Sequence, residues 1–274
     1  MTSGALGDYP DFARWSDGPR AWGPDGRWRL WFGGKVADAI VELLDDHIAT
    51  IGRHSAAAIG CVPWLTHPGI ADRLAKLHAC CIVVDKGARW VPDVLRTAEN
   101  SFPNVLPGME SYAPPADDGK PVIVGPYSGR IEYEVGPLRT LGMTGHDGKP
   151  LLHSKLLVLG RLAWHEYGPH DGPTAEELRF EPLSVWWGSA NWTDKAASHL
   201  ETGTWSDDPQ LAREAARYAE DLIGFSEPFG ATTPLPVRDL PYVIEDTDAM
   251  REAALDMHYY ELEMRALDEE HDEP

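Results

Sequence analysis

Two pairs of polar residues, each with one residue between its members, could together hold and attack a phosphoryl group. His153 and Lys155 begin the segment HSKLLVL, whose pattern predicts a strand, so both side chains project from the same face. An ammonium group can neutralise the nonbridging oxygens of a phosphate while a neutral imidazole attacks phosphorus. The pair therefore indicates nucleophilic chemistry on phosphate.

The second pair is Ser189 and Asn191, at the end of another predicted strand. Their hydroxyl and amide groups are neutral donors that could bind the same oxygens, and Gly188 allows the backbone to approach closely. Glu201 follows ten residues after Asn191. Its carboxylate could hold the Nδ1 proton of His153 and leave Nε2 as the attacking atom, or it could pair with a base on the surface.

Taken together, the two segments resemble the signature of the phospholipase D superfamily, H-x-K followed by G-S-x-N. The matching residues are His153-Ser154-Lys155 and Gly188-Ser189-Ala190-Asn191, followed by Trp192-Thr193 and then Leu200-Glu201. The resemblance covers about residues 36–225. It implies a metal-independent phosphodiesterase with a phosphohistidine intermediate and no cofactor, in which the catalytic residues are His153, Lys155, Ser189, Asn191 and Glu201.

The chain departs from the family pattern in two ways. The family carries an Asp five residues after the Lys, where this chain has Gly160. The chain also has one H-x-K segment, whereas the family's reaction uses two histidines, one as nucleophile and one to protonate the leaving oxygen. The resemblance therefore implies a homodimer whose two copies share one active site.

The surrounding pattern predicts an α/β fold with a mixed, mostly parallel sheet flanked by helices. Helical spacing over residues 35–51 is followed by apolar strands at 55–65 and 80–85 with a helix at 72–78 between them, which is typical of a βαβ unit. Further strands are expected at 122–124, 131–135, 153–159, 183–189 and 201–205, further helices at 194–199, 210–223 and 247–267, and a polar insertion at 160–182.

Three parts of the chain differ in composition. Residues 1–33 are rich in Trp, Gly and Pro and are predicted to form an irregular arm whose aromatic side chains pack on the main domain. Residues 34–228 form the expected catalytic domain, and residues 229–274 form an acidic C-terminal extension. The last thirty positions hold 12 acidic and 2 basic residues, a net charge of −10 out of −20 for the whole chain.

Composition restricts the class of protein. The chain is 43% hydrophobic with a mean hydropathy of −0.34, and no stretch approaches the roughly 18 apolar residues of a spanning helix. The first residues have no basic start or apolar core typical of a signal peptide. Three cysteines are too few for a disulfide framework, so a cytoplasmic protein is expected. The negative charge disfavours broad, nonspecific binding of nucleic acid.

Several other residues carry two interpretations. His165 and His170 could bind a metal with Glu166, although their Gly/Pro-rich setting favours exposure to solvent, and no metal is expected. His67 could line a substrate groove, but a partly buried, hydrogen-bonded histidine is the simpler interpretation. Trp186 and Trp187 alternate across a strand, so one is expected in the core while the other could line the cleft.

Three functions remain open at this point. A nuclease, for example one acting in defence against foreign DNA, ranks first, with nucleic acid as the substrate. A phospholipase D-type lipid phosphodiesterase or phosphatidyltransferase ranks second, because the chain lacks a basic amphipathic helix to dock on phospholipid. An inactive binding module ranks third, since its only support is Gly160 in place of the family's Asp.

Overall fold

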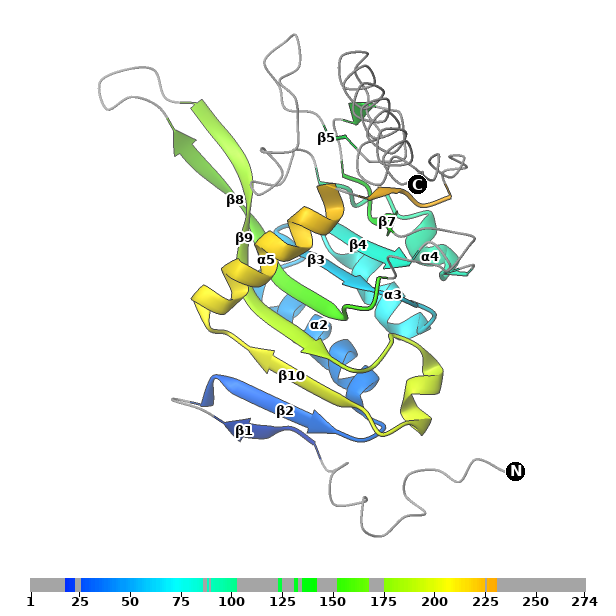
Figure 1. Ribbon diagram of the computed structural model, residues 1–274. Helices are drawn as coiled ribbons and strands as arrows, with labels where there is room; N and C mark the ends of the chain where they lie inside the picture. The colour runs from blue at the N-terminus through cyan, green and yellow to red at the C-terminus, as the bar shows by residue number, and fades with distance from the viewer. Residues whose placement is uncertain are drawn as a thin grey trace, which may run out of the picture.

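The computed structural model describes residues 18–22, 26–85, 88, 90–102, 123–124, 131–132, 135–141, 152–167, 175–224 and 226–230. They form an α/β fold around a nine-stranded sheet with the strand order β1-β2-β10-β9-β8-β3-β4-β7-β11 (Figure 1). The strands are β1 (Arg20–Trp22), β2 (Trp28–Phe32), β3 (Ala56–Val62), β4 (Ala79–Asp85), β7 (Leu138–Leu141), β8 (Leu156–Tyr167), β9 (Ala175–Gly188), β10 (Thr202–Ser206) and β11 (Glu227–Pro228). A separate pair is formed by β5 (Ile123–Val124) and β6 (Ile131–Glu132).

The sheet is mixed, as predicted, but it is mostly antiparallel. Only the β3–β4 and β4–β7 pairings within the nine-stranded sheet are parallel. The predicted βαβ unit is present, because α3 (Pro68–Lys76) connects β3 to β4. The expectation of a mostly parallel sheet was wrong because β8 runs antiparallel to β3. From there to the edge of the sheet, β9, β10 and β2 each pair antiparallel with the strand before them in the sheet order.

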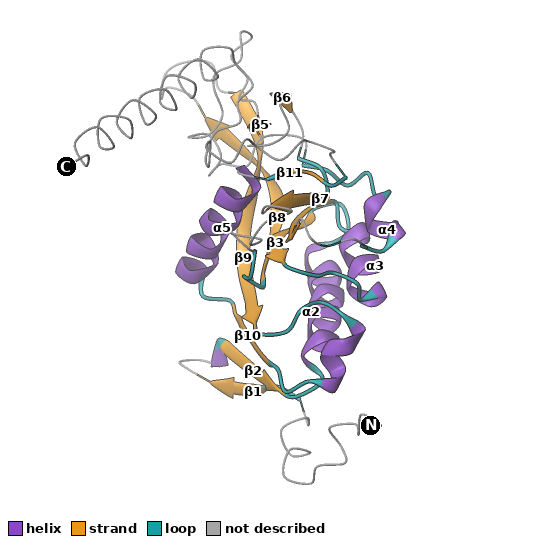
Figure 2. Cartoon of the chain, turned by 45° about the vertical axis from the view of Figure 1, so that its right-hand side comes forward, coloured by secondary structure: helices purple, strands orange, loops and turns teal. Residues whose placement is uncertain are grey.

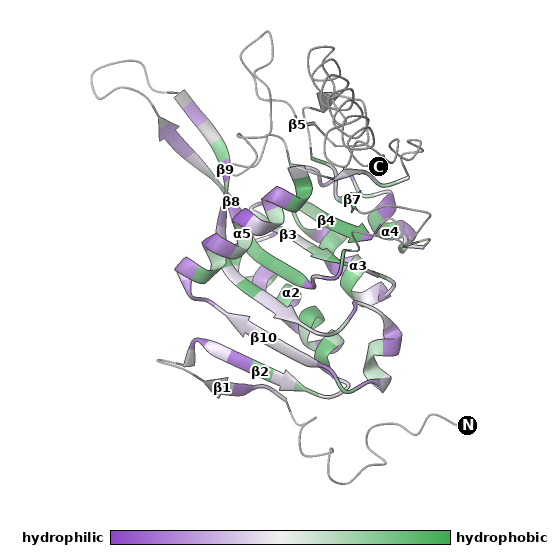
Figure 3. Ribbon diagram, viewed as in Figure 1, coloured by the Kyte–Doolittle hydropathy of each residue, from purple (hydrophilic) through white to green (hydrophobic). Residues whose placement is uncertain are grey.

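Helices cover both faces of the sheet. On one face lie α2 (Val36–Ile51), α3 and the short α4 (Asp93–Arg96), and on the other lies α5 (Pro209–Gly224) (Figure 2). Every residue of β3 and β4 is buried, as expected for central strands covered on both sides, and these strands are apolar in Figure 3. The described helices are all too short or too polar to cross a membrane.

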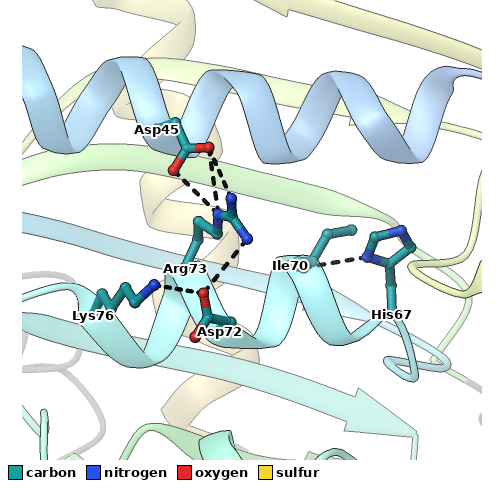
Figure 4. A network of polar contacts seen from close by, with 6 residues as sticks. All are labelled: Asp45, His67, Ile70, Asp72, Arg73 and Lys76. Carbon is teal, nitrogen blue, oxygen red and sulfur yellow. Dashed lines mark hydrogen bonds and ion pairs between the residues drawn. The ribbon is translucent and has the colours of Figure 1, made fainter.

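Polar contacts fix α3 against α2 (Figure 4). The Arg73 guanidinium donates to the Asp45 carboxylate of α2 at 3.1 Å, whereas the hydrogen bond of 2.6 Å from Lys76 to Asp72 lies within α3. At the start of α3, His67 Nδ1 accepts a hydrogen bond of 3.2 Å from the Ile70 amide and so caps the helix. The loop between β3 and α3 is therefore anchored at its helical end.

Residues 160–182, expected to be a polar insertion, instead continue two long strands. β8 and β9 form a hairpin that projects beyond the sheet, since β3 pairs with β8 only as far as Arg161 (Figure 1). The backbone ladder between β8 and β9 holds it together, and a cross-strand ion pair at its base places Arg161 Nε 2.6 Å from Glu181 Oε2. A ribbon exposed on both faces has polar residues on both, so its composition is like that of a loop.

The segment expected to be an irregular arm contributes two edge strands. β2 pairs antiparallel with β10, and β1 pairs with β2. Trp31 of β2 is buried against the α2 side, whereas Trp28 packs edge-on against Trp187 at 5.5 Å on the opposite side. The predicted packing of aromatic side chains is thus present for these residues, but through a strand. Its partner lies about 170 positions later in the sequence, so no local pattern indicates it.

The strand expected over 153–159 begins at Leu156, so His153 and Lys155 precede it, and the expectation that they project from one strand face was wrong: His153 is exposed and Lys155 is buried. Other expected elements agree within a few residues. The helix expected at 72–78 begins earlier, at Pro68, and the one expected at 194–199 is a 3-10 helix, η4 (Asp194–Ser198). The predicted helix at 247–267 and residue Trp15 lie outside the described residues.

Candidate active site

The candidate residues meet at one edge of the sheet, beyond the carboxyl ends of the parallel strands β3 and β4. Cys61, near the end of β3, pairs with Leu156 at the start of β8, and Leu156 pairs in turn with Trp187 at the end of β9. β10 then begins beside the end of β9. This edge is where open α/β sheets commonly bind ligands.

The H-x-K segment is held from two sides. The Leu152 amide donates to the carboxylate of buried Asp85, at the end of β4, at 3.1 Å. Ser154, between His153 and Lys155, shares a hydrogen bond of 2.6 Å with the Tyr218 hydroxyl of α5. The segment that carries the candidate nucleophile is therefore anchored to the sheet and to the helix on its other face.

Lys155 is only 8% exposed, which is unusual for a lysine. Burial lowers the pKa of its ammonium, while the negative charge of Glu201 acts to raise it. Burial also raises the pKa of the neighbouring Cys61 thiol to about 12, so the thiol is neutral at physiological pH. Glu201 is therefore the countercharge of Lys155.

The side chains of Ser189 and Glu201 are hydrogen-bonded to one another. The Ser189 hydroxyl donates to Glu201 Oε2 at 2.5 Å and accepts the Thr202 amide at 2.9 Å. The Ser189 amide donates to the Thr202 carbonyl at 2.9 Å, and the Gly33 amide donates to the Glu201 carbonyl at 2.8 Å. Both donors of Ser189 are thus engaged, so its hydroxyl must turn away from Glu201 before it can donate to a phosphate.

His153 is exposed, and its carbonyl oxygen accepts a hydrogen bond of 2.9 Å from Lys155 Nζ. Within the described part of the chain, no hydrogen bond joins the His153 ring to Glu201, so that pairing stays a prediction. Asn191 Oδ1 is buried and has no hydrogen-bond partner among the described residues. The structure thus brings Lys155, Ser189 and Glu201 together through side chains and His153 through its backbone.

Two glycines are required by close approach. A Cβ atom at Gly188 would overlap the Thr202 carbonyl oxygen, so the close backbone approach expected there is to the neighbouring strand β10. A Cβ atom at Gly160 would overlap the Glu181 carbonyl oxygen and lie 2.5 Å from the Phe180 ring. Gly160, where the β8–β9 register shifts, therefore has no space for the family's aspartate in this fold.

A cavity of about 650 Å³ opens beside Glu201. Its lining also includes Trp64, Thr66, Asn191, Thr193, Asp194, Lys195, Ala196 and His199. Trp64 was not predicted as a cavity residue, and Asp85 and Tyr218 were not predicted as supports of the H-x-K segment. The available signal for Trp64 and Asp85 was their position at the ends of buried strands that run toward this edge.

The remaining candidates have structural partners. His67 caps α3, and its Nε2 lies 3.6 Å from the Asp194 carboxylate. His165 Nε2 lies 2.9 Å from Glu181, while His170 is outside the described residues. Trp186 is buried, and partly buried Trp187 packs on Trp28. In the part of the chain that is described, no three histidine, cysteine or acidic side chains gather as metal ligands.

Comparison with known proteins gives distant matches in structure. No protein-family profile matches the chain, and no curated protein matches it in sequence. Among solved structures, the chain is similar to NucT from Helicobacter pylori, with 14% identity, a TM-score of 0.43 and coverage of 74% of this chain and 98% of NucT. It is also similar to Nuc, a phospholipase D family member from Salmonella typhimurium, with 15% identity, a TM-score of 0.40 and coverage of 74% and 98%.

A third similar structure is polyphosphate kinase from Porphyromonas gingivalis, with 14% identity, a TM-score of 0.40 and coverage of 75% of this chain and 27% of the kinase. All three likenesses are distant, so a function has to be inferred from the residues at the site itself.

Proposed function

We propose that the chain is a metal-independent phosphodiesterase of the phospholipase D type that cleaves nucleic acid through a phosphohistidine intermediate. His153 is the nucleophile, Lys155 and Asn191 bind the phosphate oxygens, and Ser189 with Glu201 sets the charge and position of this group. Cys61, Cys80 and Cys81 form no disulfide bond, which supports a cytoplasmic setting as part of the proposal.

One observation carries the proposal: a nearly buried ammonium with unused donors beside an exposed histidine. Lys155 Nζ has three N–H groups, and among the described residues one hydrogen bond, to the His153 carbonyl, is present. Burying a charged group without full hydrogen bonding costs free energy. An anionic ligand at this position would accept the remaining N–H groups, and it would lie beside the residue expected to attack it.

The chemistry proceeds in two displacements. The neutral His153 nitrogen attacks phosphorus, a P–N bond forms, and the bond from phosphorus to the leaving oxygen breaks as that oxygen takes a proton. Water then attacks phosphorus and gives a proton to the group that protonated the leaving oxygen, the P–N bond breaks, and the phosphomonoester and free imidazole are released. Lys155 stabilises the negative charge of the nonbridging oxygens in both steps.

Because His153 is the nucleophile, another group must donate the proton to the leaving oxygen. We assign this role to His153 of a second copy of the chain, because the sequence offers one H-x-K segment. A homodimer with the two His153 side chains facing one phosphate would supply both the nucleophile and the acid.

The test is cleavage of plasmid and of single-stranded DNA in EDTA by the full chain. His153→Ala should abolish cleavage, whereas His54→Ala, an exposed histidine in the turn before β3, should not. Acid-labile, base-stable phosphate on the protein after rapid quenching should disappear in His153→Ala. Equal cleavage by His153→Ala and the wild type would overturn the proposal.

Phospholipid vesicles form the comparison arm. Release of headgroup from phosphatidylcholine or cardiolipin vesicles, with no cleavage of either DNA, would replace the nuclease by the lipid enzyme. Absence of both activities in a folded dimer would favour an inactive binding module.

A further inference from the structure

We propose that the cavity beside Glu201 is a nucleobase subsite, in which the indole of Trp64 stacks on a base next to the scissile phosphate. The inference rests on the proposed function and narrows the substrate to single-stranded nucleic acid. A base that is stacked and paired inside a duplex presents its edges but not its face, so it cannot lie flat on a tryptophan in a pocket.

Trp64 supplies the stacking surface. It lies immediately beyond β3 and is 50% exposed, although it borders a cavity of about 650 Å³. Pockets of about 300–1,000 Å³ hold ligands the size of a drug molecule, so this one can hold a nucleoside-sized group. The indole thus has an accessible surface beside a volume that suits a planar ligand.

The two walls of the cavity are fixed to one another by backbone hydrogen bonds. The Trp192 amide donates to the Trp64 carbonyl at 3.1 Å, and the Trp192 carbonyl accepts the Thr66 and His67 amides at 2.8 and 2.9 Å. His67 is itself held as the cap of α3 (Figure 4). The strand end that carries Trp64 and the segment that carries Asn191 therefore form one frame.

The same frame places the cavity next to the proposed phosphate site. Asn191 and Glu201 line the cavity, and Glu201 accepts the Ser189 hydroxyl and is the countercharge of Lys155. A group held in the cavity would thus be within a short distance of the phosphate that Lys155 binds. In a nucleic acid, the group next to a phosphate is a nucleoside.

The charges of the lining favour a neutral ligand over a second phosphate. Asp194 and Glu201 are opposed by Lys195, and His199 adds a charge only when protonated. This lining has no excess of positive charge for an anion, but its hydroxyl, amide and carboxylate groups suit the polar edge of a base. A choline headgroup could also place its cation over the indole, so phosphocholine is the competing ligand in the binding test.

Equilibrium binding tests the subsite without turnover. The full chain carrying His153→Ala is titrated into a fluorescein-labelled single-stranded oligonucleotide of about eight nucleotides, and anisotropy is compared with that of an abasic oligonucleotide of the same length. The base-containing oligonucleotide should bind more tightly. Adding Trp64→Ala should weaken its binding about 5- to 150-fold, since stacking on one aromatic side chain contributes about 1–3 kcal/mol, and should leave abasic binding unchanged.

Two further variants make the result specific. Trp64→Phe should retain most of the affinity because it keeps an aromatic face. Trp164→Ala, which removes a 68% exposed tryptophan on the β8–β9 hairpin outside the cavity lining, should have no effect on the preference for bases.

Equal affinity of the parent protein for the two oligonucleotides, an unchanged preference in Trp64→Ala, or no binding of either oligonucleotide would overturn the subsite. So would Trp64-dependent binding of phosphocholine with none of the oligonucleotide. Failure of the proposed function gives a different result, namely no cleavage by the wild type while the Trp64-dependent preference for bases persists.

Discussion

The Ser189 hydroxyl donates a hydrogen bond of 2.5 Å to the Glu201 carboxylate, and through this contact the G-S-x-N segment is joined to the start of β10. Hydrogen bonds to an ionised acceptor are shorter and stronger than neutral ones. The same carboxylate raises the pKa of Lys155 against the effect of burial. The charge of Glu201 thus favours the protonated form of Lys155 at the site.

Replacing Glu201 by Gln tests this role. The substitution removes the charge that raises the pKa of Lys155, so that pKa should fall further. Because the Lys155 amine must be protonated to bind phosphate, the alkaline limb of the kcat/KM profile for DNA cleavage should move to lower pH. Activity at neutral pH should fall about tenfold or more. The measurement is a pH–rate profile between about pH 6 and 10.

Ser189→Ala is the matched control for the Glu201 variant. It removes the hydrogen bond but keeps the carboxylate charge, so its activity should fall with a smaller movement of the alkaline limb. An alkaline limb that is the same in the wild type and Glu201→Gln would contradict the role of the carboxylate charge.

Lys155→Met should separate activity from stability. The side chain is 8% exposed and burial lowers the pKa of the ammonium, so the fold carries an unfavourable buried charge. Methionine has a similar length without the charge. We expect cleavage to fall by at least about 100-fold while the free energy of unfolding is retained within about 1 kcal/mol or rises.

Urea unfolding followed by circular dichroism measures the second quantity. Lys76→Met, at an exposed lysine of α3 paired with Asp72, should leave cleavage unchanged. A large loss of stability in Lys155→Met would show that the ammonium serves the fold and not the site.

Gly160→Asp restores the residue type of the family motif but should not improve the enzyme. A side chain there would overlap the Glu181 carbonyl oxygen and the Phe180 ring, and it would bury a carboxylate. We expect the free energy of unfolding to fall by about 2 kcal/mol or more. Gly136→Asp, where nothing lies within 4 Å of an added Cβ atom, should cost much less. Equal midpoints of urea unfolding for the two variants would contradict the steric explanation.

Local patterns predicted the centre of the fold well. The continuous apolar segments of β3 and β4, with an amphipathic helix between them, predicted a parallel pair, and the two strands do pair in parallel. The pattern in HSKLLVL likewise predicted a strand, and β8 begins within that segment, at Leu156, and pairs with β3. These elements are specified by residues close together in the sequence.

What the sequence did not indicate depends on distant partners. β2 pairs with β10, and just beyond β2 the Gly33 amide donates a hydrogen bond to the carbonyl of Glu201, a candidate site residue. Asp85 and Tyr218 support the H-x-K segment from 67 and 64 positions away. Their residue types are common at strand ends and on helix surfaces, so only the folded chain shows what they contact.

His47 should make stability depend on pH. It is buried on α2, its Nε2 donates to the Gly160 carbonyl at 2.8 Å, and burial lowers its pKa. Above about pH 6.5 the residue is neutral in both the folded and the unfolded chain, so it contributes no pH dependence. As the pH falls below that value, the unfolded chain takes up a proton that the folded chain does not, and the free energy of unfolding decreases.

His47→Gln can keep a donor to the Gly160 carbonyl but cannot titrate. The decrease in the free energy of unfolding between pH 7 and 5 should therefore be smaller in this variant, by at most about 2 kcal/mol, the limit for one group with an unfolded pKa near 6.5. His54→Gln, at an exposed position, should follow the wild type. Parallel stability curves for wild type and His47→Gln would mean that His47 accepts a proton in the folded chain, because burial would then not oppose its charge.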